Sequence, residues 1–509
     1  MLAIVVIPAL LILWIITSIR RHNKSGLKDI PNAHFSVPYS RLWLLSIRWR
    51  KKENRSRIYL HRRLGPVVRL APRELSVNCV EDGIRTIYSA KFDKDADFYH
   101  ALVDQTGFMV TMIGNDEHRR RRRMLAHPYS NSYITNSGTI DNILSRVKHR
   151  LQEGMAQWAS TGASVDVYMQ AKCSMLDVVT GFLFGSENAT DTLLDPSFEN
   201  DLTTLTQATT KNLHVRTSLE WPMSYFASWI GGNVRPDPVA RSRWEEWLTQ
   251  VITNSYRSHP TKPSSTASLY DHFYDNFKAA DPEMSLNDMA SFIAVECDDH
   301  LSASHIGLGI LLSYTMYELS RAPHWQHALR KELGTLNEPS ELSLAHRLPN
   351  LRVLDAVVTE TMRTRAPCPG PFPRLVPESG CRLVGKFDVP GGTVVSSSAW
   401  ALHFNPDPFP VPDEWRPQRW LEADEKTEVE MRKWIWTFGS GARVCIGTHF
   451  SARVMKELLI TIYSNYETLL DEEFTESVEQ EDVFSSSPLA GRIQLKFRRL
   501  TQPDTMVVA

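Results

Sequence analysis

The segment FGSGARVCIG, residues 438–447, combines the residue types that thiolate chemistry needs. Cys445 stands directly before a helical pattern that runs through Lys456, and the N-terminal end of a helix stabilises a negatively charged sulfur. Gly447 removes a side chain next to that sulfur, which leaves room for a flat group to lie against it. Arg443 adds a cation two residues before the cysteine. Together these residues predict an anionic cysteine that faces a broad, anionic ligand.

A second unusual stretch, LSASHIGLGI at residues 301–310, lies inside a long helical pattern. The pattern begins with a capping-box sequence, SLND, at residues 285–288 and meets no proline until Pro323. A helix of about 35 residues at 1.5 Å each would be roughly 50 Å long, enough to cross a whole domain. An interior glycine costs a helix roughly 1 kcal/mol relative to alanine. Gly307 and Gly309 therefore indicate that another group approaches this helix closely.

The remaining patterns predict a mainly helical domain with small β-sheets. Residues 66–78, PVVRLAPRELSVN, alternate between apolar and polar side chains, which predicts a β-hairpin. The patterns from about residue 91 to residue 331 are mostly helical, and residues 350–366 predict a further helix that ends before a proline. Short strands are expected over residues 381–402, and a proline-rich meander follows at residues 403–420.

The composition is that of a globular protein with balanced charge. The 509 residues are 42% hydrophobic, and 57 basic residues stand against 58 acidic ones, which gives a formal net charge of −1. Nucleic-acid binding needs a basic face, so nucleic acid is not an expected partner. Six cysteines show no paired spacing, and no Cys/His cluster has the spacing of a zinc site. Cys445 is therefore distinguished by its surroundings alone.

Residues 1–19, MLAIVVIPALLILWIITSI, carry no charged side chain and are followed by RRHNK. This length lies at the lower end of the range for a transmembrane helix. A cleaved secretory signal would carry its positive charge before the apolar run, whereas here the charge follows it. Positive residues beside a span stay in the cytoplasm. We therefore expect one N-terminal membrane anchor, residues 1–22, and a cytosolic domain, residues 23–509.

The cysteine segment resembles the haem loop of the cytochrome P450 superfamily, which reads Phe-x-x-Gly-x-Arg-x-Cys-x-Gly. This chain supplies Phe438, Gly441, Arg443, Cys445 and Gly447 without a gap. The resemblance implies the cytochrome P450 fold with haem b, iron protoporphyrin IX, as the cofactor. It also implies that Cys445 is the axial ligand of the haem iron and that the other four residues contact the haem.

Two further segments resemble the structural network of that family. ETMR matches the Glu-x-x-Arg motif through Glu360 and Arg363, which lie on one helix face and can pair. RPQRW in the meander supplies Arg419 as the third member. The resemblance implies a structural role for these three residues, namely to fix the cysteine loop.

Three basic residues match positions that reach the haem propionates in the family. DEHRRRRRML resembles the helix that supplies His118 and Arg122, and FPRLVPE places Arg374 at a further propionate contact. The neighbours of Arg122 in the arginine run are expected to face solvent, where they can help dock an acidic redox partner.

The resemblance implies a haem-thiolate monooxygenase that oxidises a small hydrophobic substrate with O2 and electrons from NADPH. The sequence has no dinucleotide fingerprint or flavin domain, so the electrons must come from a separate NADPH–cytochrome P450 reductase, with cytochrome b5 as a second candidate donor. With the anchor, this implies the endoplasmic reticulum membrane and a cytosolic catalytic domain. The meander and GTHFSARVMKELL resemble fungal P450s of specialised metabolism, whose substrates include terpenoids, polyketides and alkaloids.

One turn of the long helix departs from the family pattern. Residues 303–308, ASHIGL, fall where the family usually reads Ala/Gly-Gly-x-Asp/Glu-Thr-Thr. Ala303 and Ser304 are as small as the pattern requires. Ile306 and Gly307, however, replace the acid and the alcohol that relay protons in the family. Ser304, His305 and Gly307 form the candidate oxygen-binding turn.

Three explanations of this departure are open at the level of sequence. The register could differ by a turn, since Asp298, Asp299, Ser302 and Ser304 lie just upstream. Ser304, His305, an ordered water or a substrate hydroxyl could replace the missing alcohol. The enzyme could also carry out a rearrangement, dehydration or oxidative coupling that needs no such relay. A different class of function, a membrane-anchored haem-binding protein without catalysis, is a remote alternative.

Overall fold

A computed structural model of the chain describes residues 25–89, 92–102, 107–197, 238–259 and 267–500, together with Thr17, Ile19, Arg20 and Asn200. The expected membrane anchor, residues 1–22, lies almost entirely outside these residues. No helix within the described ranges is both long enough and apolar enough to cross a bilayer.

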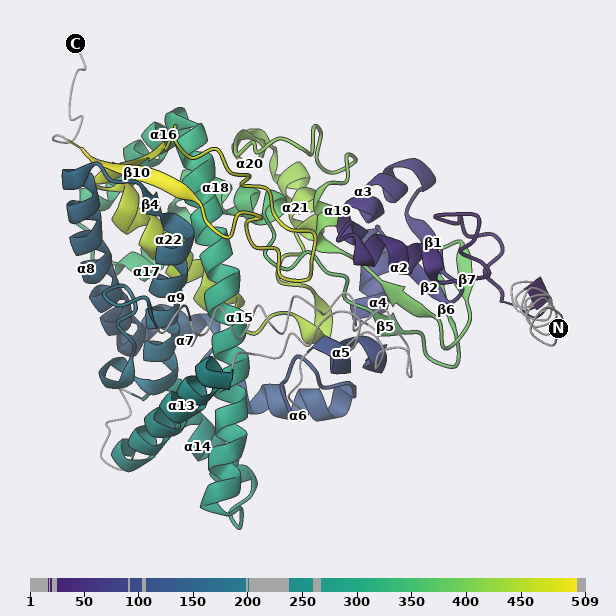
Figure 1. Cartoon of the computed structure of the whole chain (residues 1–509), viewed down its shortest axis with the longest axis horizontal. Helices are drawn as coiled ribbons and strands as arrows, with labels where there is room; N and C mark the ends of the chain where they lie inside the picture. The colour runs from purple at the N-terminus through teal and green to yellow at the C-terminus, as the bar shows by residue number, and fades with distance from the viewer. Residues whose placement is uncertain are drawn as a thin grey trace, which may run out of the picture.

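The larger part of the molecule is helical and is organised around α15 (Leu286–Arg321), which runs through its middle (Figure 1). The Oγ of Ser285 accepts a hydrogen bond from the backbone N–H of Asp288 (3.1 Å), so the helix begins where the capping pattern predicts. It ends at Arg321, just before Pro323, as predicted. The other long helices of this part are α8 (Gly138–Thr161), α9 (Val167–Phe184), α13 (Pro238–Ser258), α14 (Leu269–Ala280), α16 (Pro323–Gly334), α18 (Arg352–Thr364) and α22 (Thr448–Tyr463).

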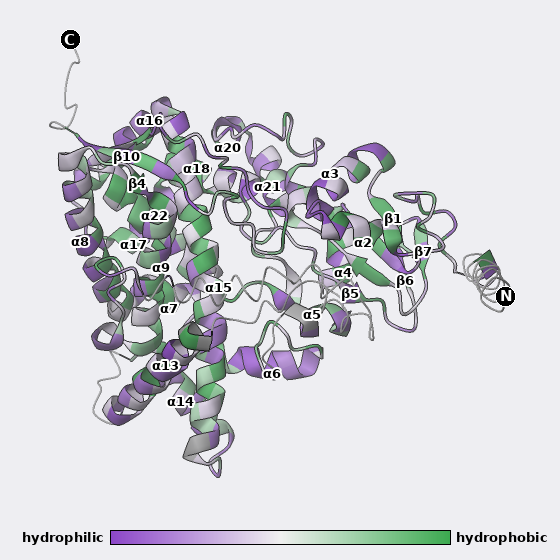
Figure 2. Cartoon of the chain, viewed as in Figure 1, coloured by the Kyte–Doolittle hydropathy of each residue, from purple (hydrophilic) through white to green (hydrophobic). Residues whose placement is uncertain are grey.

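Shorter helices connect these elements, and two of them, α2 and α3, pack against the five-stranded sheet described below. They are α2 (Leu42–Trp49), α3 (Glu53–Leu64), α4 (Arg85–Ser89), α5 (Ala96–Leu102), α6 (Asn115–Leu125), α7 (Asn131–Asn136), α17 (Leu344–Arg347), α19 (Ala399–His403), α20 (Gln418–Glu422) and α21 (Glu425–Trp434). Figure 2 shows α6 as an almost wholly hydrophilic helix. This appearance follows from its sequence, NDEHRRRRRML.

Three small sheets lie within the part of the chain that the structure describes. The largest has the strand order β1 (Val67–Ala71), β2 (Glu74–Val77), β8 (Val394–Ser396), β5 (Arg374–Leu375), β3 (Asp93–Lys94). A second has the order β4 (Val165–Asp166), β10 (Gln494–Arg499), β9 (Tyr466–Leu470), and a third pairs β6 (Cys381–Leu383) with β7 (Phe387–Val389). The antiparallel pairing of β1 with β2 confirms the predicted hairpin. The prediction of a mainly helical fold with small sheets is likewise confirmed.

The strands predicted over residues 381–402 are correct for β6, β7 and β8 but wrong for the last residues, which form α19. The β8 ladder ends because the next backbone N–H groups bond elsewhere. Ser397 donates to the Oη of Tyr88 (2.9 Å), and Ala399 donates to the carbonyl of Pro369 (2.7 Å). The chain therefore leaves the sheet and turns into a short helix.

The two largest hydrophobic cores among the described residues hold the parts together. The main core lies among α8, α9, α15, α18 and α22 and includes Leu176, Ile310 and Leu458. A second core covers the five-stranded sheet and includes Leu75 and Val395. The cysteine loop, residues 438–447, leads into α22, whose buried face belongs to the main core. The packing of α22 therefore fixes where this loop emerges.

Candidate active site

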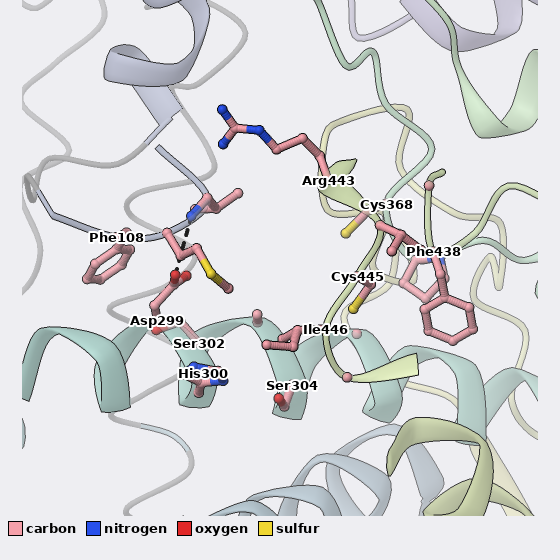
Figure 3. Close-up of a pocket in the computed structure, with 18 of the residues that line it drawn as sticks. Phe108, Asp299, His300, Ser302, Ser304, Cys368, Phe438, Arg443, Cys445 and Ile446 are labelled. Atoms are coloured by element: carbon pink, nitrogen blue, oxygen red, sulfur yellow. Dashed lines mark hydrogen bonds between the residues drawn. The ribbon is translucent and has the colours of Figure 1, made fainter. Parts of the chain in front are cut away.

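A cavity of about 520 Å³ lies between α15 and the cysteine loop (Figure 3). Its volume falls within the range of small-molecule sites, and such sites are mostly apolar with a few placed polar groups. Apolar side chains from several elements line it, among them Phe108, Met109, Leu308, Phe372, Phe450 and Phe484. Cys445 and Ile446 border the same space from the loop.

The cysteine loop is closed by its own backbone. The N–H of Cys445 donates to the carbonyl of Phe438 (2.8 Å), which brings the two ends of the turn together. Gly439 and Gly441 both have φ of +69°, a left-handed conformation that glycine adopts without steric cost. Gly447 is the N-cap of α22. These features place Cys445 at the cavity wall, and Figure 3 shows its side chain there, close to Cys368.

The Cys445 side chain is open to the cavity, yet enclosure by the surrounding protein raises the pKa of its thiol above the usual value. The backbone N–H of Gly447 and the charge of Arg122 act in the opposite direction. Because α22 begins at Thr448, the cysteine lies just before the first turn of that helix. The anionic sulfur expected from the sequence stays a prediction, and a bound metal ion would supply that state because a coordinating thiol is deprotonated outright.

Arg443 connects the cysteine loop to the backbone that leads into α6. Its Nη1 donates to the carbonyl of Met112 (2.9 Å), and its Nη2 donates to the carbonyls of Ile113 (2.9 Å) and Gly114 (3.0 Å). These bonds hold the guanidinium at the edge of the cavity, which it also lines.

The arginine run of α6 divides into three groups. Arg122 lines the cavity and donates through Nη1 to the carbonyl of Val444, next to the cysteine (2.6 Å). The expectation that the neighbours of Arg122 face solvent is wrong for Arg121, because its guanidinium turns inward and forms an ion pair with the buried Glu296 of α15 (2.5 Å). The remaining members are exposed, as predicted from the sequence: Arg119, Arg120 and Arg123.

His118 lies on the cavity side of α6 and is buried. Burial lowers its pKa to about 3, and the nearby cations Arg443, Lys94 and Arg122 add to this effect. The imidazole is therefore neutral at physiological pH and offers an N–H group rather than a charge.

Arg374 and Lys94 form the opposite side of this basic cluster. Arg374 is buried, lines the cavity and donates through Nη1 to the Oη of Tyr99 (2.7 Å). Lys94 is buried beside it and donates to the carbonyl of Val110 (2.6 Å). Nothing in the sequence distinguishes Lys94, because it matches no motif and lies between two aspartates, as in an ordinary surface segment.

The comparison with known families agrees with this geometry. The sequence pattern described as Cytochrome P450 matches residues 36–496, which include the cavity, α15 and the cysteine loop. The chain belongs to the cytochrome P450 family. Cytochrome P450 monooxygenase avaI of Aspergillus versicolor is 30% identical over 410 residues, which cover 76% of this chain and 91% of that protein.

Other relatives of this P450 are also fungal monooxygenases. Cytochrome P450 monooxygenase hkm5 of Aspergillus hancockii is 26% identical over 448 residues, 85% of this chain and 83% of that protein. A cytochrome P450 monooxygenase of Aspergillus terreus is 26% identical over 500 residues, 92% of this chain and 94% of that protein. The chain is thus a cytochrome P450 monooxygenase, and its family is one of haem enzymes.

The site of this P450 fits a haem on three observations. A cysteine sulfur, which ligates haem iron as the thiolate, faces the cavity. A Cβ built on Gly447 would touch the Sγ of Cys445 at 3.8 Å, so the glycine keeps this position beside the sulfur free of a side chain. Four cations border the cavity without a carboxylate at ion-pair distance among the described residues: Lys94, Arg122, Arg374 and Arg443.

The long helix brings two of its three candidate residues to the cavity. Ser304 and Gly307 line it, but His305 does not. The His305 ring is fully buried on another side of α15, and its Nδ1 bonds to the carbonyl of Leu301 (2.9 Å). The structure therefore does not place His305 where it could replace the missing alcohol.

The two glycines of this P450's long helix have different surroundings. A Cβ on Gly307 would meet no atom within 4 Å outside the helix's own backbone, so the position opens onto the cavity. A Cβ on Gly309 would lie 2.7 Å from the Cγ and 3.1 Å from the Cα of Lys172 in α9. Gly309 therefore serves helix packing, whereas Gly307 leaves room at the cavity.

An acid of the long helix reaches the cavity two turns before Gly307. The carboxylate of Asp299 accepts a hydrogen bond from the backbone N–H of Val110 (3.4 Å), as the dashed line in Figure 3 shows. Burial raises its pKa to about 6. Ser302, one turn further along, also lines the cavity. Asp299 and Ser302 are thus an acid and an alcohol at the cavity, upstream of the expected positions.

Glu360, Arg363 and Arg419 form the buried network that the sequence predicts. Arg363 binds both carboxylate oxygens of Glu360, with Nε–Oε2 at 2.9 Å and Nη2–Oε1 at 2.8 Å. Arg419 donates to Oε1 (3.0 Å), and the indole N–H of Trp420 donates to Oε2 (3.0 Å). The carboxylate is therefore surrounded by donors and excluded from water.

Proposed function

We propose that this P450 is a membrane-anchored haem-thiolate monooxygenase that oxidises a small hydrophobic substrate with O2 and NADPH-derived electrons. The observation that carries the proposal is the position of Cys445 at the wall of a largely apolar cavity, opposite the open turn of α15. Such a cavity removes water from an apolar substrate and orients it by shape.

The cofactor in this proposal is haem b with Cys445 as the axial iron ligand. When bound, haem with a thiolate ligand supplies oxygen activation, because the sulfur pushes electron density toward the iron and favours O–O cleavage. Arg122, Arg374 and Arg443 would hold its propionates, with His118 as a neutral donor. The protein's own contribution is to position the substrate and to exclude bulk water.

The loop residues Phe438, Gly441 and Gly447 would shape the surface against which the haem lies. Phe438 receives the hydrogen bond that closes the loop, and Gly441 permits its turn. Gly447 keeps the space beside the sulfur free of a side chain. None of these residues needs to react, so their proposed role is to preserve the geometry around Cys445.

The absorption spectrum of the reduced, CO-bound protein tests the proposed site. A thiolate-type Soret band is expected for the full chain and its loss is expected for Cys445→Ala. The matched control is Cys173→Ala, which changes a buried cysteine that does not line the cavity. Absence of the thiolate-type band in the unmodified chain would contradict the assignment of Cys445.

A second candidate function is favoured by Ile306 and Gly307. An enzyme without the usual acid and alcohol is suited to rearrangement, dehydration or oxidative coupling, in which proton delivery differs from that of hydroxylation. Asp299 and Ser302 offer an alternative acid and alcohol for hydroxylation itself. The product profile with a reductase present distinguishes the two functions.

Substitution of Gly307 tests how far this turn controls the reaction. Gly307→Thr is expected to change the ratio of product formed to NADPH consumed by roughly twofold or more, because positioned proton-transfer groups affect rates well beyond that factor. The site can accept the side chain, since no atom outside the helix backbone lies within 4 Å of the new Cβ. Gly307→Val is the control, with the same shape but no hydroxyl. Equal ratios for the threonine and valine variants would show that the hydroxyl has no role here.

The proposed electron donor is a separate NADPH–cytochrome P450 reductase, with cytochrome b5 as a second donor. Support comes from the exposed arginines of α6, whose helix also contacts the cysteine loop through Arg122. Arg119, Arg120 and Arg123 present positive charge that an acidic partner surface would complement. Residues 1–22 would anchor the enzyme in the endoplasmic reticulum membrane, with residues 23–509 in the cytosol.

The proposed substrates are specialised metabolites such as terpenoids, polyketides or alkaloids. Support comes from the resemblance to fungal P450s and from relatives that are fungal monooxygenases. Metabolite profiling after expression of the chain with a reductase, and after deletion of its gene, would identify the substrate. Accumulation of no precursor in the deletion strain would contradict this assignment.

A further inference from the structure

Lys94 and Arg374 are two buried cations placed directly opposite each other. Lys94 lies in β3 and Arg374 in β5, and the register of the antiparallel pair sets Lys94 against Arg374. The two residues are only 6% and 4% exposed. Like charges that are directly opposite on neighbouring strands destabilise a sheet, and burial increases the cost. An anion bound by both side chains would offset this repulsion.

Among the residues that the structure describes, no carboxylate lies at ion-pair distance from either side chain, and Asp299 attracts Lys94 only from farther away. The Nζ of Lys94 donates to the carbonyl of Val110 (2.6 Å) and lies 4.6 Å from the centre of the Tyr99 ring. Arg374 donates to the Oη of Tyr99. All of these partners are neutral. Burial and the charges of Arg443 and Arg374 lower the pKa of Lys94 well below its usual value, and they outweigh the attraction of Asp299.

The alternation of the strand explains why Lys94 enters the cluster. Asp93 is exposed and Lys94 is buried, so the carboxylate beside it in sequence faces away from the amine. The ammonium group has three donors and gives one of them to Val110, which leaves two for a ligand. Lys94 also lines the cavity together with Arg374 and Arg443.

We propose that Lys94 binds a carboxylate in the cavity, together with Arg374 and Arg443, and that this carboxylate is a haem propionate. The proposal rests on the proposed haem site and adds to it a cation that lies outside the motifs matched in this sequence. The same chemistry could come from the carboxylate of an acidic substrate, because Lys94 borders the substrate space as well. The favoured source is the propionate, since both neighbouring cations lie in the cluster that surrounds the cysteine loop.

The test compares Lys94→Met with the unmodified full-length chain, with and without haem. Loss of one charge-assisted hydrogen bond is expected to weaken haem binding about tenfold, measured as the rate of haem transfer to an excess of a haem-acceptor protein. Without haem, the variant is expected to unfold at the same temperature as the unmodified chain or a higher one, because one of two opposed buried cations is gone. A purely structural role for Lys94, through Val110, predicts lower stability in both forms and would overturn the proposal.

Lys386→Met is the matched control, since Lys386 is exposed and does not line the cavity. It should change neither haem transfer nor stability. The source of the carboxylate is distinguished by spectral titration of the holoenzyme with dodecanoate and with dodecanol. Unchanged haem transfer with selective loss of dodecanoate binding in Lys94→Met would assign the carboxylate to a substrate. If neither measurement changes, Lys94 binds no carboxylate, whether or not the enzyme oxidises any compound.

Discussion

Replacing Glu360 with glutamine is expected to destabilise this P450 by about 3–5 kcal/mol and to prevent haem incorporation, because it leaves buried charges without their partner. The carboxylate accepts hydrogen bonds from Arg363, Arg419, Trp420 and the backbone N–H of Arg416. Glutamine has one acceptor oxygen and an NH2 group, so it would turn a donor toward donors. The two guanidinium groups would then lack a counter-charge in a region closed to water.

The damage should extend to the cysteine loop because the network is connected to it by hydrogen bonds. Arg363 donates to the carbonyl of His403 (2.8 Å), and the Nε2 of His403 accepts from the backbone N–H of Trp436 (2.7 Å). The Oγ1 of Thr437 donates to the carbonyl of Met362 in α18 (3.0 Å). Trp436 and Thr437 directly precede Phe438, the residue that closes the loop. Loss of Glu360 therefore removes the support of Cys445 without touching the cavity.

Urea unfolding and the haem-to-protein absorbance ratio measure these two consequences. The control is Glu430→Gln, because Glu430 is exposed, forms an ion pair with Lys433 and should contribute less than about 0.5 kcal/mol. If Glu360→Gln unfolds at the same urea concentration as the control, the network contributes nothing that a neutral side chain cannot replace.

The same network predicts the direction of the response to acid. Burial alone would raise the pKa of Glu360, but the hydrogen bonds and charge of Arg363, together with the charge of Arg419, hold it below the ordinary value of 4.5. A carboxylate with a lowered pKa in the folded state stabilises the protein above pH 4.5 and loses this contribution as pH falls through the folded pKa. Glu360→Gln should therefore remove part of the acid sensitivity of unfolding.

The parts of the site that could be predicted from sequence are those encoded in short segments. The order of residues from Phe438 to Gly447 specifies a glycine-rich turn before a helix, and Glu360 and Arg363 are neighbours on one helix face whatever surrounds them. The capping serine and the later proline likewise set the ends of α15. In each case the interacting residues are close in sequence, so the interaction can be predicted from the sequence alone.

Lys94 could not be found in this way because its environment depends on distant pairing. It meets Arg374, which lies 280 positions later in the chain, only through the register of β3 with β5. The position of Asp299 at the cavity depends similarly on the rotation of α15 and on Val110. The phase of a buried helix cannot be read from its sequence when apolar and polar residues occur on all sides. For this reason the sequence predicts His305 in the oxygen-binding turn, whereas its ring is buried away from the cavity.

The two glycines of α15 are expected to respond with opposite signs to alanine substitution. Gly309→Ala should destabilise the protein by about 1–3 kcal/mol, because the new Cβ would lie 3.1 Å from the Cα of Lys172 and the backbones of α15 and α9 would have to separate. Gly307→Ala should stabilise the haem-free protein by up to about 1 kcal/mol, because alanine is the better helix former and meets no neighbour. Both values come from urea unfolding followed by far-UV circular dichroism.

The two alanine substitutions distinguish two reasons why a helix can contain glycine. If packing against neighbouring elements were the only reason for glycine in α15, Gly307 would have no role of its own. Gly307→Ala would then be more stable than the unmodified chain and would bind haem equally well. If Gly307 leaves room at the cavity, the same substitution should stabilise the empty protein while changing the spectral response to substrate. Destabilisation by both substitutions would mean that α15 is packed closely at Gly307 as well, and the open turn assigned to the oxygen-binding region would not exist.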